Sequence, residues 1–248
     1  MTAHRAPLPL RGHVAVVTGG TSGIGAGLVA GLVDAGAAVA VWSRTARTSS
    51  RASGAALLVD CDVADAAQVR RAVGVTLAEL GAVDSCFTAA GINRQDAALD
   101  TAPAVFRSVV RVNLEGTFHV FRLLAGHMRD RGRGNLVAVS SIAALSGQAR
   151  TAHYAASKAA LVGLTEAAAV ELRPHGIAVN VVVPGFVATP MLAPHLADRR
   201  FVDRVLPRIP LGRWAVPDDF AALAVHLATT RASGGRFLVD GGYTVSKT

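Results

Sequence analysis

The chain has 248 residues, of which 51% are hydrophobic and 17% are charged, and its formal net charge is +8 at neutral pH. This apolar content excludes an intrinsically disordered chain. No apolar run reaches the roughly 18 residues that a membrane-spanning helix needs. The Lys and Arg residues are scattered without aromatic residues between them, which argues against a nucleic-acid interface. The first residues carry no secretory pattern, so we expect a soluble, cytoplasmic protein without membrane or nucleic-acid partners.

Short apolar runs alternate along the chain with longer segments of helical pattern. The runs that predict strands lie at 13–18, 37–42, 57–63, 83–91, 135–141, 178–185 and 234–242. The clearest helical patterns end near Ala35 and cover 65–80 and 103–130. Apolar strands that alternate with helices predict a parallel sheet buried on both faces. The expected fold is therefore α/β: a doubly wound, Rossmann-like sheet of about seven strands with helices on both faces.

We expect one dinucleotide-binding domain over residues 1–248, with a substrate lid around 190–213. The two cysteines, Cys61 and Cys86, lie in predicted strands that are three spacings apart in the order 3-2-1-4, about 14 Å. A disulfide needs Cα atoms within about 7 Å, so both are predicted to be core thiols. No His or Cys pair has the spacing of metal ligands, and we expect no metal.

A glycine-rich segment, TGGTSGIG at 18–25, joins the first predicted strand to the first helix. Glycines permit a tight turn, and the following helix N-terminus presents free N–H groups to a pyrophosphate. The spacing differs from G-x-G-x-x-G, and strand–helix turns favour glycine in any case, but the position after the first strand favours a dinucleotide site. The residues expected to bind cofactor here are Gly19, Thr21, Ser22, Gly23, Ile24 and Gly25.

The end of the second predicted strand decides between the two nicotinamide dinucleotides. An acid there accepts a hydrogen bond from the ribose 2′-hydroxyl of NAD, whereas a 2′-phosphate needs a cation. The sequence has Ser43 and Arg44 at this point and no acid before Asp60. NADP(H) is therefore favoured over NAD(H), the alternative being that Arg44 is an ordinary exposed loop residue.

Tyr154 and Lys158 are four residues apart in a helical pattern and share one helix face. A free phenol has a pKa near 10, and a neighbouring ammonium is expected to lower it. The pair occurs often by chance, but here Ser141 ends the preceding strand, thirteen residues before Tyr154. The carboxyl edge of a parallel sheet is where open α/β enzymes place their chemistry.

With these residues the chain resembles the short-chain dehydrogenase/reductase family along nearly its whole length. The matching segments occur in the family's order: TGGTSGIG at 18–25, CDV at 61–63, AAG at 89–91, VNLEG at 112–116, VSSIAA at 139–144, YAASK at 154–158, VNVVVPGFVAT at 179–189, PLGR at 210–213 and VDGGY at 239–243.

The resemblance implies a role for each matching residue. Tyr154 would donate or accept the proton, and Ser141 would hydrogen-bond the reacting oxygen. Lys158 would also bind the nicotinamide ribose, and Asn113 would hold a water that links Lys158 to solvent. The remaining residues implied for the cofactor are Asp62 and Val63 near the adenine, Ala90 and Gly91 beyond the fourth strand, and Pro184, Gly185, Val187 and Thr189 near the carboxamide.

Two departures from the family pattern stand out. The family's Asn-Ala-Gly is Ala89-Ala90-Gly91 here, so the Asn that steadies the central sheet is missing. The connection over 43–56 is shorter than the helical connection of most relatives, which implies an open adenosine pocket.

The expected function is NADP(H)-dependent carbonyl reduction or secondary-alcohol oxidation of a small molecule. A 3-oxoacyl-carrier-protein reductase is one alternative function. A catalytically silent regulatory protein that binds NADP(H) is an alternative of a different class. An epimerase or dehydratase fits the length of this chain less well, because such relatives tend to be longer. The resemblance also implies a homotetramer or homodimer. Near the lid, we expect either pocket or core positions for Phe186, Met191, Leu192 and Trp214. Gln148 and Arg150 lie between Ser141 and Tyr154 and could reach the substrate, although we expect Arg150 to be exposed on the surface.

Overall fold

A computed structural model describes residues 8–49 and 54–246 of the chain. Seven strands form one parallel sheet in the order β3-β2-β1-β4-β5-β6-β7. The strands are β1 (Val14–Thr18), β2 (Ala38–Ser43), β3 (Leu57–Asp60), β4 (Ser85–Thr88), β5 (Gly134–Val139), β6 (Ile177–Pro184) and β7 (Arg236–Val239). The order reverses between β1 and β4, which confirms the predicted doubly wound fold.

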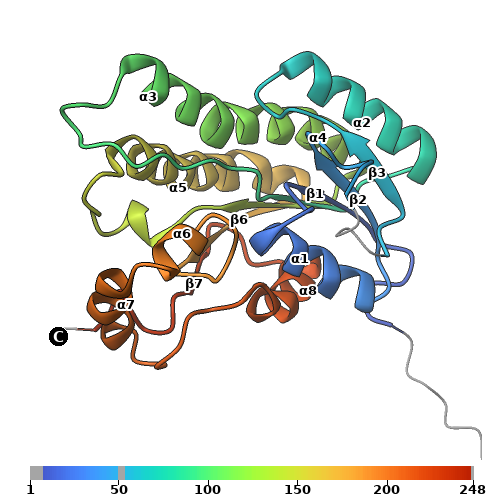
Figure 1. The fold of residues 1–248 in the computed structure, drawn as a ribbon. Coiled ribbons are helices and arrows are strands. Elements are labelled where there is room, and N and C mark those ends of the chain that lie inside the picture. Colours follow the sequence, from blue (N-terminus) through green and yellow to red (C-terminus); the bar gives the residue numbers. More distant parts are fainter. Residues whose placement is uncertain (1–7, 50–53, 247–248) are drawn as a thin grey trace, which may run out of the picture.

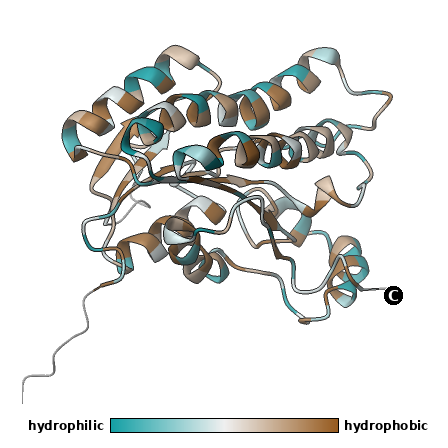
Figure 2. Ribbon diagram, turned by 180° about the vertical axis from the view of Figure 1, so that it is seen from behind, coloured by the Kyte–Doolittle hydropathy of each residue, from teal (hydrophilic) through white to brown (hydrophobic). Residues whose placement is uncertain are grey.

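Helices cover both faces of this sheet (Figure 1). The α-helices are α1 (Gly23–Asp34), α2 (Ala66–Leu80), α3 (Pro103–Val110), α4 (Gly116–Arg131), α5 (Ala152–Leu172), α6 (Ala193–Leu196), α7 (Arg199–Val205) and α8 (Ala221–Thr229). Helices α2 to α5 lie over one face, and α1 and α8 lie under the other. Figure 2 shows the hydrophobic strands between these two helical layers.

Alternation along the strands divides the core into two parts. Val16 packs in the cluster that contains α2 and α4 residues, while its neighbours Ala15 and Val17 pack with α1 and α8. Side chains of consecutive strand residues point to opposite faces, so a strand that is apolar at every position supplies both clusters. This is why the strands read as continuous apolar runs.

Several predicted strands are shorter in the structure. The run 57–63 forms a strand only to Asp60, 83–91 only over 85–88, and 234–242 only over 236–239. The run 57–63 is shortened at its carboxyl end, and the other two are shortened at both ends. Cys61 lies just past β3 and Cys86 within β4, and both are free and buried, as predicted.

The predicted helix over 103–130 is interrupted by one π-helical turn at Arg111–Glu115, between α3 and α4. Apolar periodicity does not reveal such a turn, because it adds one residue to a helix that otherwise continues. Asn113 lies within it and is completely buried. Wide turns of this kind often occur at functional sites.

Candidate active site

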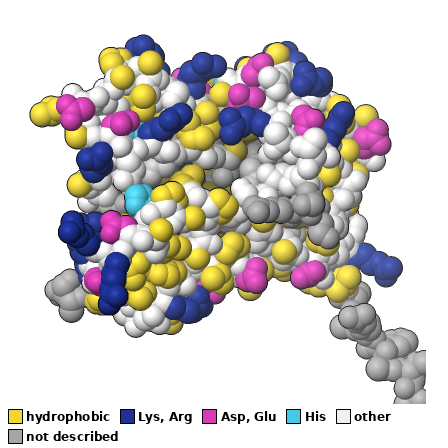
Figure 3. All heavy atoms as spheres, in the orientation of Figure 1, with side chains coloured by type: hydrophobic (Ala, Val, Ile, Leu, Met, Phe, Trp, Pro, Cys, Tyr) yellow, Lys and Arg dark blue, Asp and Glu magenta, His cyan; other side chains and the backbone are white. Residues whose placement is uncertain are grey.

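The carboxyl edge of the sheet encloses a cavity of about 260 Å³. It runs from the turn after β1 to the start of α5, and the molecule is hollowed on this side (Figure 3). The predicted site residues that line it are Gly19, Ser22, Gly23, Ile24, Gly25, Ala90, Gly91, Ser141, Tyr154, Lys158, Pro184, Gly185, Val187 and Thr189. The predicted residues outside its wall are Thr21, Ser43, Arg44, Asp62, Val63 and Asn113.

The glycine turn fits the pyrophosphate of a dinucleotide. A Cβ at Gly19, whose φ is +68°, would lie 2.8 Å from the Cα of Ala90, so only glycine lets the turn approach the end of β4 this closely. Helix α1 begins at Gly23, and its N-cap residue Ser22 makes no side-chain capping bond. The first amides of α1 therefore remain available to an anion, and the helix dipole favours negative charge there.

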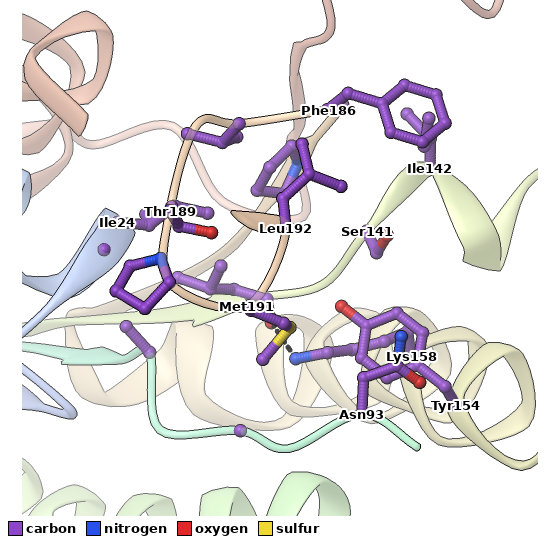
Figure 4. Close-up of a pocket in the computed structure, with 18 of the residues that line it drawn as sticks. Ile24, Asn93, Ser141, Ile142, Tyr154, Lys158, Phe186, Thr189, Met191 and Leu192 are labelled. Carbon is purple, nitrogen blue, oxygen red and sulfur yellow. Dashed lines mark hydrogen bonds between the residues drawn. The ribbon is translucent and has the colours of Figure 1, made fainter. Parts of the chain in front are cut away.

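Ser141 and Tyr154 meet in the cavity wall (Figure 4). Ser141 lies two residues after Val139, the last residue of β5. Its hydroxyl accepts a hydrogen bond from the backbone amide of Ala143 at 3.2 Å. Burial raises the pKa of Tyr154, and a hydrogen bond with Ser141 opposes this rise. The sequence predicted that Lys158 lowers the pKa of this phenol; the pKa is instead raised, because desolvation outweighs the hydrogen bond with Ser141.

Lys158 is buried, one turn along α5 from Tyr154. Its Nζ donates to the carbonyl oxygen of Val139 at 2.7 Å and lies 5.7 Å from the centroid of the Tyr154 ring. Burial lowers the pKa of Lys158 to about 8. The ammonium thus faces the aromatic ring and the end of β5, and no carboxylate neutralises it in the described contacts.

Asn113 supports the cavity from behind. Its Oδ1 accepts from the amide of Ile92 at 2.8 Å, and its Nδ2 donates to the carbonyl oxygen of Ile92 and to the Oγ of Ser157, each at 3.0 Å. The π-helical turn brings the side chain to this point. A Cβ at Gly91 would lie 3.3 Å from Asn113 Oδ1 and 3.5 Å from Lys158 Nζ, so Asn113 and Lys158 border the same glycine.

The predicted adenosine side lies at the ends of β2 and β3. Thr21 and Ser43 share a hydrogen bond of 3.1 Å that ties the glycine turn to β2. Arg44 is exposed just beyond. The Asp60 carboxylate accepts from the backbone amide of Arg47 at 3.1 Å. The described parts of the connection, 43–49 and 54–56, contain no helix, as the shortened sequence predicts.

The segment after β6 forms the opposite wall. Phe186, Met191 and Leu192 line the cavity, whereas Trp214 stands behind it and stacks on Phe201 with centroids 6.1 Å apart. The sequence left open whether these four residues lie in the pocket or in the core. Three of them line the pocket, and Trp214 lies behind it. Gln148 lines the cavity, and Arg150 is exposed outside its wall, as expected.

The sequence did not single out several residues that line the cavity, among them Asn93, Gln95, His195 and Phe201. Gln95 Nε2 and His195 Nε2 are 2.8 Å apart and join the segment after β4 to α6. These residues lie about 100 positions apart in the chain, and neither belongs to a recognisable motif. Only the fold brings them together.

None of the helices in the described ranges is both long and apolar enough to cross a membrane.

Comparisons with known proteins agree with this geometry. A family model described as short chain dehydrogenase matches residues 13–200. The short-chain reductase NovJ of Streptomyces niveus is 38% identical, with 92% of this chain and 93% of that protein covered. A cis-4-hydroxycyclohexanecarboxylate dehydrogenase of Sinomonas cyclohexanicum is also 38% identical, with 94% and 96% covered.

Among solved structures, a gluconate 5-dehydrogenase of Burkholderia cenocepacia in complex with NADP and tartrate matches with a TM-score of 0.89. It is 33% identical, and the match covers 97% of this chain and 99% of that one. The chain therefore belongs to the short-chain dehydrogenase/reductase family of NAD(P)-dependent oxidoreductases.

Proposed function

We propose that the protein interconverts a carbonyl group and a secondary alcohol, with Tyr154 as the group that gives or takes the proton. The observation that carries this proposal is the meeting of Ser141, Tyr154 and Lys158 in one cavity, which continues to the glycine turn. A protein that only senses a dinucleotide needs the turn but not this set of three.

A bound nicotinamide supplies or accepts hydride at the substrate carbon. In the reducing direction, the hydroxyls of Ser141 and Tyr154 donate hydrogen bonds to the carbonyl oxygen, and Tyr154 releases its proton as charge develops there. The raised pKa keeps the phenol protonated at neutral pH, as an acid requires. The Lys158 ammonium stabilises the phenolate that remains. Asn113 acts on the site by holding Ile92 and Ser157 in place.

Tyr154→Phe tests this assignment. The substitution removes only the hydroxyl, so we expect turnover of ketones to fall by a factor of about 10² or more, the usual size of a general-acid contribution. The affinity for the reduced dinucleotide, measured by fluorescence titration, is expected to stay within about twofold. Near-normal turnover in the variant contradicts the proposal, and a wild-type protein that reduces no carbonyl compound supports a dinucleotide-binding regulator instead.

We further propose that the preferred cofactor is NADP(H). Arg44 is exposed at the end of β2, beside Ser43, where it is free to approach a 2′-phosphate. The carboxylate at the end of the neighbouring strand, Asp60, is already bonded to a backbone amide. The structure of the gluconate 5-dehydrogenase holds NADP, which is consistent with this preference.

Arg44→Ala tests the cofactor preference. Loss of a charge-assisted hydrogen bond is expected to weaken NADPH binding about tenfold and to leave NADH binding almost unchanged. Arg231→Ala, at an exposed arginine after α8, is the matched control and is expected to change neither. A wild-type protein that binds NADH more tightly than NADPH contradicts the preference.

We also propose a homo-oligomer formed through the outer layer of helices. Phe118 on α4 is 47% exposed and Val170 on α5 is 78% exposed, which leaves large apolar side chains facing outward on neighbouring helices. Light scattering coupled to size exclusion tests this directly, and a monomeric mass contradicts it.

A further inference from the structure

The part of the cavity near the start of α5 carries three polar side chains that the proposed reaction does not use. Gln95 comes from the segment after β4, Gln148 from the loop before α5, and His195 from α6, and all three line the cavity. Gln95 is exposed, whereas Gln148 and His195 are half-buried, so the three lie at the outer end of the cavity. Segments that are distant in the chain thus bring hydrogen-bonding groups to the side where a substrate would enter.

Gln95 is held in place although its segment, 89–97, forms neither a helix nor a strand. The amide and the carbonyl of Ile92 are both bonded to the side chain of Asn113, at 2.8 and 3.0 Å. The carbonyl oxygen of Arg94 lies 2.9 Å from Nε2 of the buried His153. These bonds fix the backbone just before Gln95, so its place in the cavity wall does not depend on a free loop.

The hydrogen bonds already made at the outer end leave donors and acceptors over. Nε2 of Gln95 lies 2.8 Å from Nε2 of His195, and because an amide nitrogen only donates, the imidazole nitrogen accepts this bond. The amide oxygen of Gln95 is then left for a donor. Gln148 uses its backbone carbonyl, which accepts from the hydroxyl of Thr151 at 2.9 Å, while its side-chain amide is bonded to no other described residue.

A hydroxyl group is the ligand chemistry that matches this set. The two amide side chains offer donors and acceptors together, and a hydroxyl likewise donates and accepts, whereas a carboxylate only accepts. Among the described residues that line the cavity there is no carboxylate, and Lys158, beside Tyr154, is the one Lys or Arg. A charged group at the outer end would therefore lack a counter-ion in this wall, and an alkyl group would leave the amides without partners.

The rest of the wall fits the carbon atoms of a hydroxylated substrate. Phe186 and Phe201 line the cavity with their ring centroids 5.7 Å apart, and Figure 4 shows Met191 and Leu192 on the segment after β6. The C–H groups of a carbon skeleton can pack on this wall while its hydroxyls turn toward the amides. One reacting carbon beside Tyr154 and further hydroxyls at the outer end describe a polyol or the corresponding hydroxyketone.

We propose that Gln95, Gln148 and His195 form a hydroxyl-binding subsite, and that the substrate class is a polyhydroxylated secondary alcohol or its ketone. The subsite binds hydroxyl groups on carbons other than the one that reacts, and Gln148, with an unbonded amide, is its main specificity-determining residue. This inference rests on the proposed function, since Tyr154 defines which carbon reacts.

The test compares neutral alcohols that differ in the hydroxyl groups away from the reacting carbon. The purified full chain oxidises 2-hexanol, the hexanediols that keep the 2-hydroxyl, and the tetritols, pentitols and hexitols, with the dinucleotide that it binds best, and kcat/KM is measured. We expect the best diol or alditol to exceed 2-hexanol by about tenfold or more, since each neutral hydrogen bond is worth about fivefold.

Gln148→Met removes the amide and keeps the length of the side chain. In this variant we expect the preference for the best polyhydroxylated alcohol over 2-hexanol to fall about fivefold, with kcat/KM for 2-hexanol within about twofold of the wild-type value. Ser146→Ala is the matched control, because Ser146 is exposed in the same loop but does not line the cavity. This variant is expected to keep the wild-type preference.

The outcomes separate this inference from the proposed function. If the wild-type protein oxidises 2-hexanol and further hydroxyls give no gain, the inference fails and the proposed function stands. The inference also fails if Gln148→Met leaves the preference unchanged or lowers kcat/KM for every alcohol by one factor. An aldonate that exceeds every neutral polyol by more than about tenfold would place a carboxylate at the outer end and overturn the inference in the same way. If the wild-type protein oxidises no alcohol and reduces no ketone, the proposed function fails and the inference falls with it.

Discussion

Lys158 is the residue whose surroundings most affect the chemistry of the cavity. A buried ammonium is costly unless it is bonded, and here one carbonyl oxygen, that of Val139, accepts from it at 2.7 Å. The lowered pKa of about 8 shows that this single bond does not offset the loss of water. The charge of Lys158 therefore changes in a pH range in which activity can be measured.

This predicts a pH dependence for ketone reduction. Tyr154 has a raised pKa and remains protonated through neutral pH, so the acid is present throughout this range. Lys158 is charged below its pKa of about 8 and loses the charge as the pH rises through that value. We expect kcat/KM for reduction to be level up to about pH 7 and to fall above about pH 8.

Lys158→Arg provides the comparison, because a guanidinium stays charged at every accessible pH. In this variant the fall in kcat/KM is expected at a higher pH than in the wild-type protein, even if the absolute rate is lower. The same midpoint in both proteins would show that another group controls the decline.

Helix α6 and the segment after β4 are joined across the mouth of the cavity. The bond between His195 and Gln95 links them, and the His195 ring also packs on Phe201, with centroids 5.1 Å apart. Arg150, whose φ is +66°, reaches the carbonyl oxygen of Gln95 at 3.4 Å. These contacts tie α6 to the segment after β4.

We predict that breaking this link weakens substrate binding more than it slows chemistry. In His195→Ala and in Gln95→Ala, KM for the best ketone is expected to rise about twofold to tenfold, with a smaller change in kcat. The double variant is expected to show no further loss, because both changes remove one bond. His175→Ala, at an exposed histidine after α5, is the control. Additive losses in the double variant would show that the two residues act separately.

At the scale of the whole molecule, the helical layer formed by α1 and α8 depends on close approach of the two helix backbones. A Cβ on Gly31 of α1 would lie 2.6 Å from both the Cα and the carbonyl oxygen of Ala221 at the start of α8. The atoms in the way are backbone, so the helices would have to separate. The glycine turn is attached directly to α1, and a shift of this helix would move the dinucleotide site.

Gly31→Ala is expected to lower the free energy of unfolding by about 1–3 kcal/mol, the usual cost of overpacking. Gly74→Ala is the matched control, since Gly74 lies in α2 and an added Cβ would meet no atom within 4 Å. There alanine is expected to stabilise the protein by about 0.5–1 kcal/mol through helix propensity. Urea unfolding measures both, and equal effects would contradict the packing argument.

Local sequence patterns predicted some features of this protein and missed others, for physical reasons. The pattern of apolar runs predicted the parallel sheet because strands buried on both faces are apolar at most positions. The π-helical turn at Arg111–Glu115 escaped prediction because hydrophobic periodicity changes little over one extra residue. The pKa of Tyr154 was predicted in the wrong direction, since spacing on a helix reports the neighbouring charge but not the loss of solvent.

The sequence by itself determined the fold class and the family, and it brought Ser141, Tyr154 and Lys158 forward as residues of one cavity, because these three lie in local motifs. Only the tertiary structure decided the partners across the cavity. Gln95 and His195 are distant in the chain and belong to no motif, so only the folded chain shows that they meet. Such contacts depend on packing between segments, which no local pattern of residues encodes.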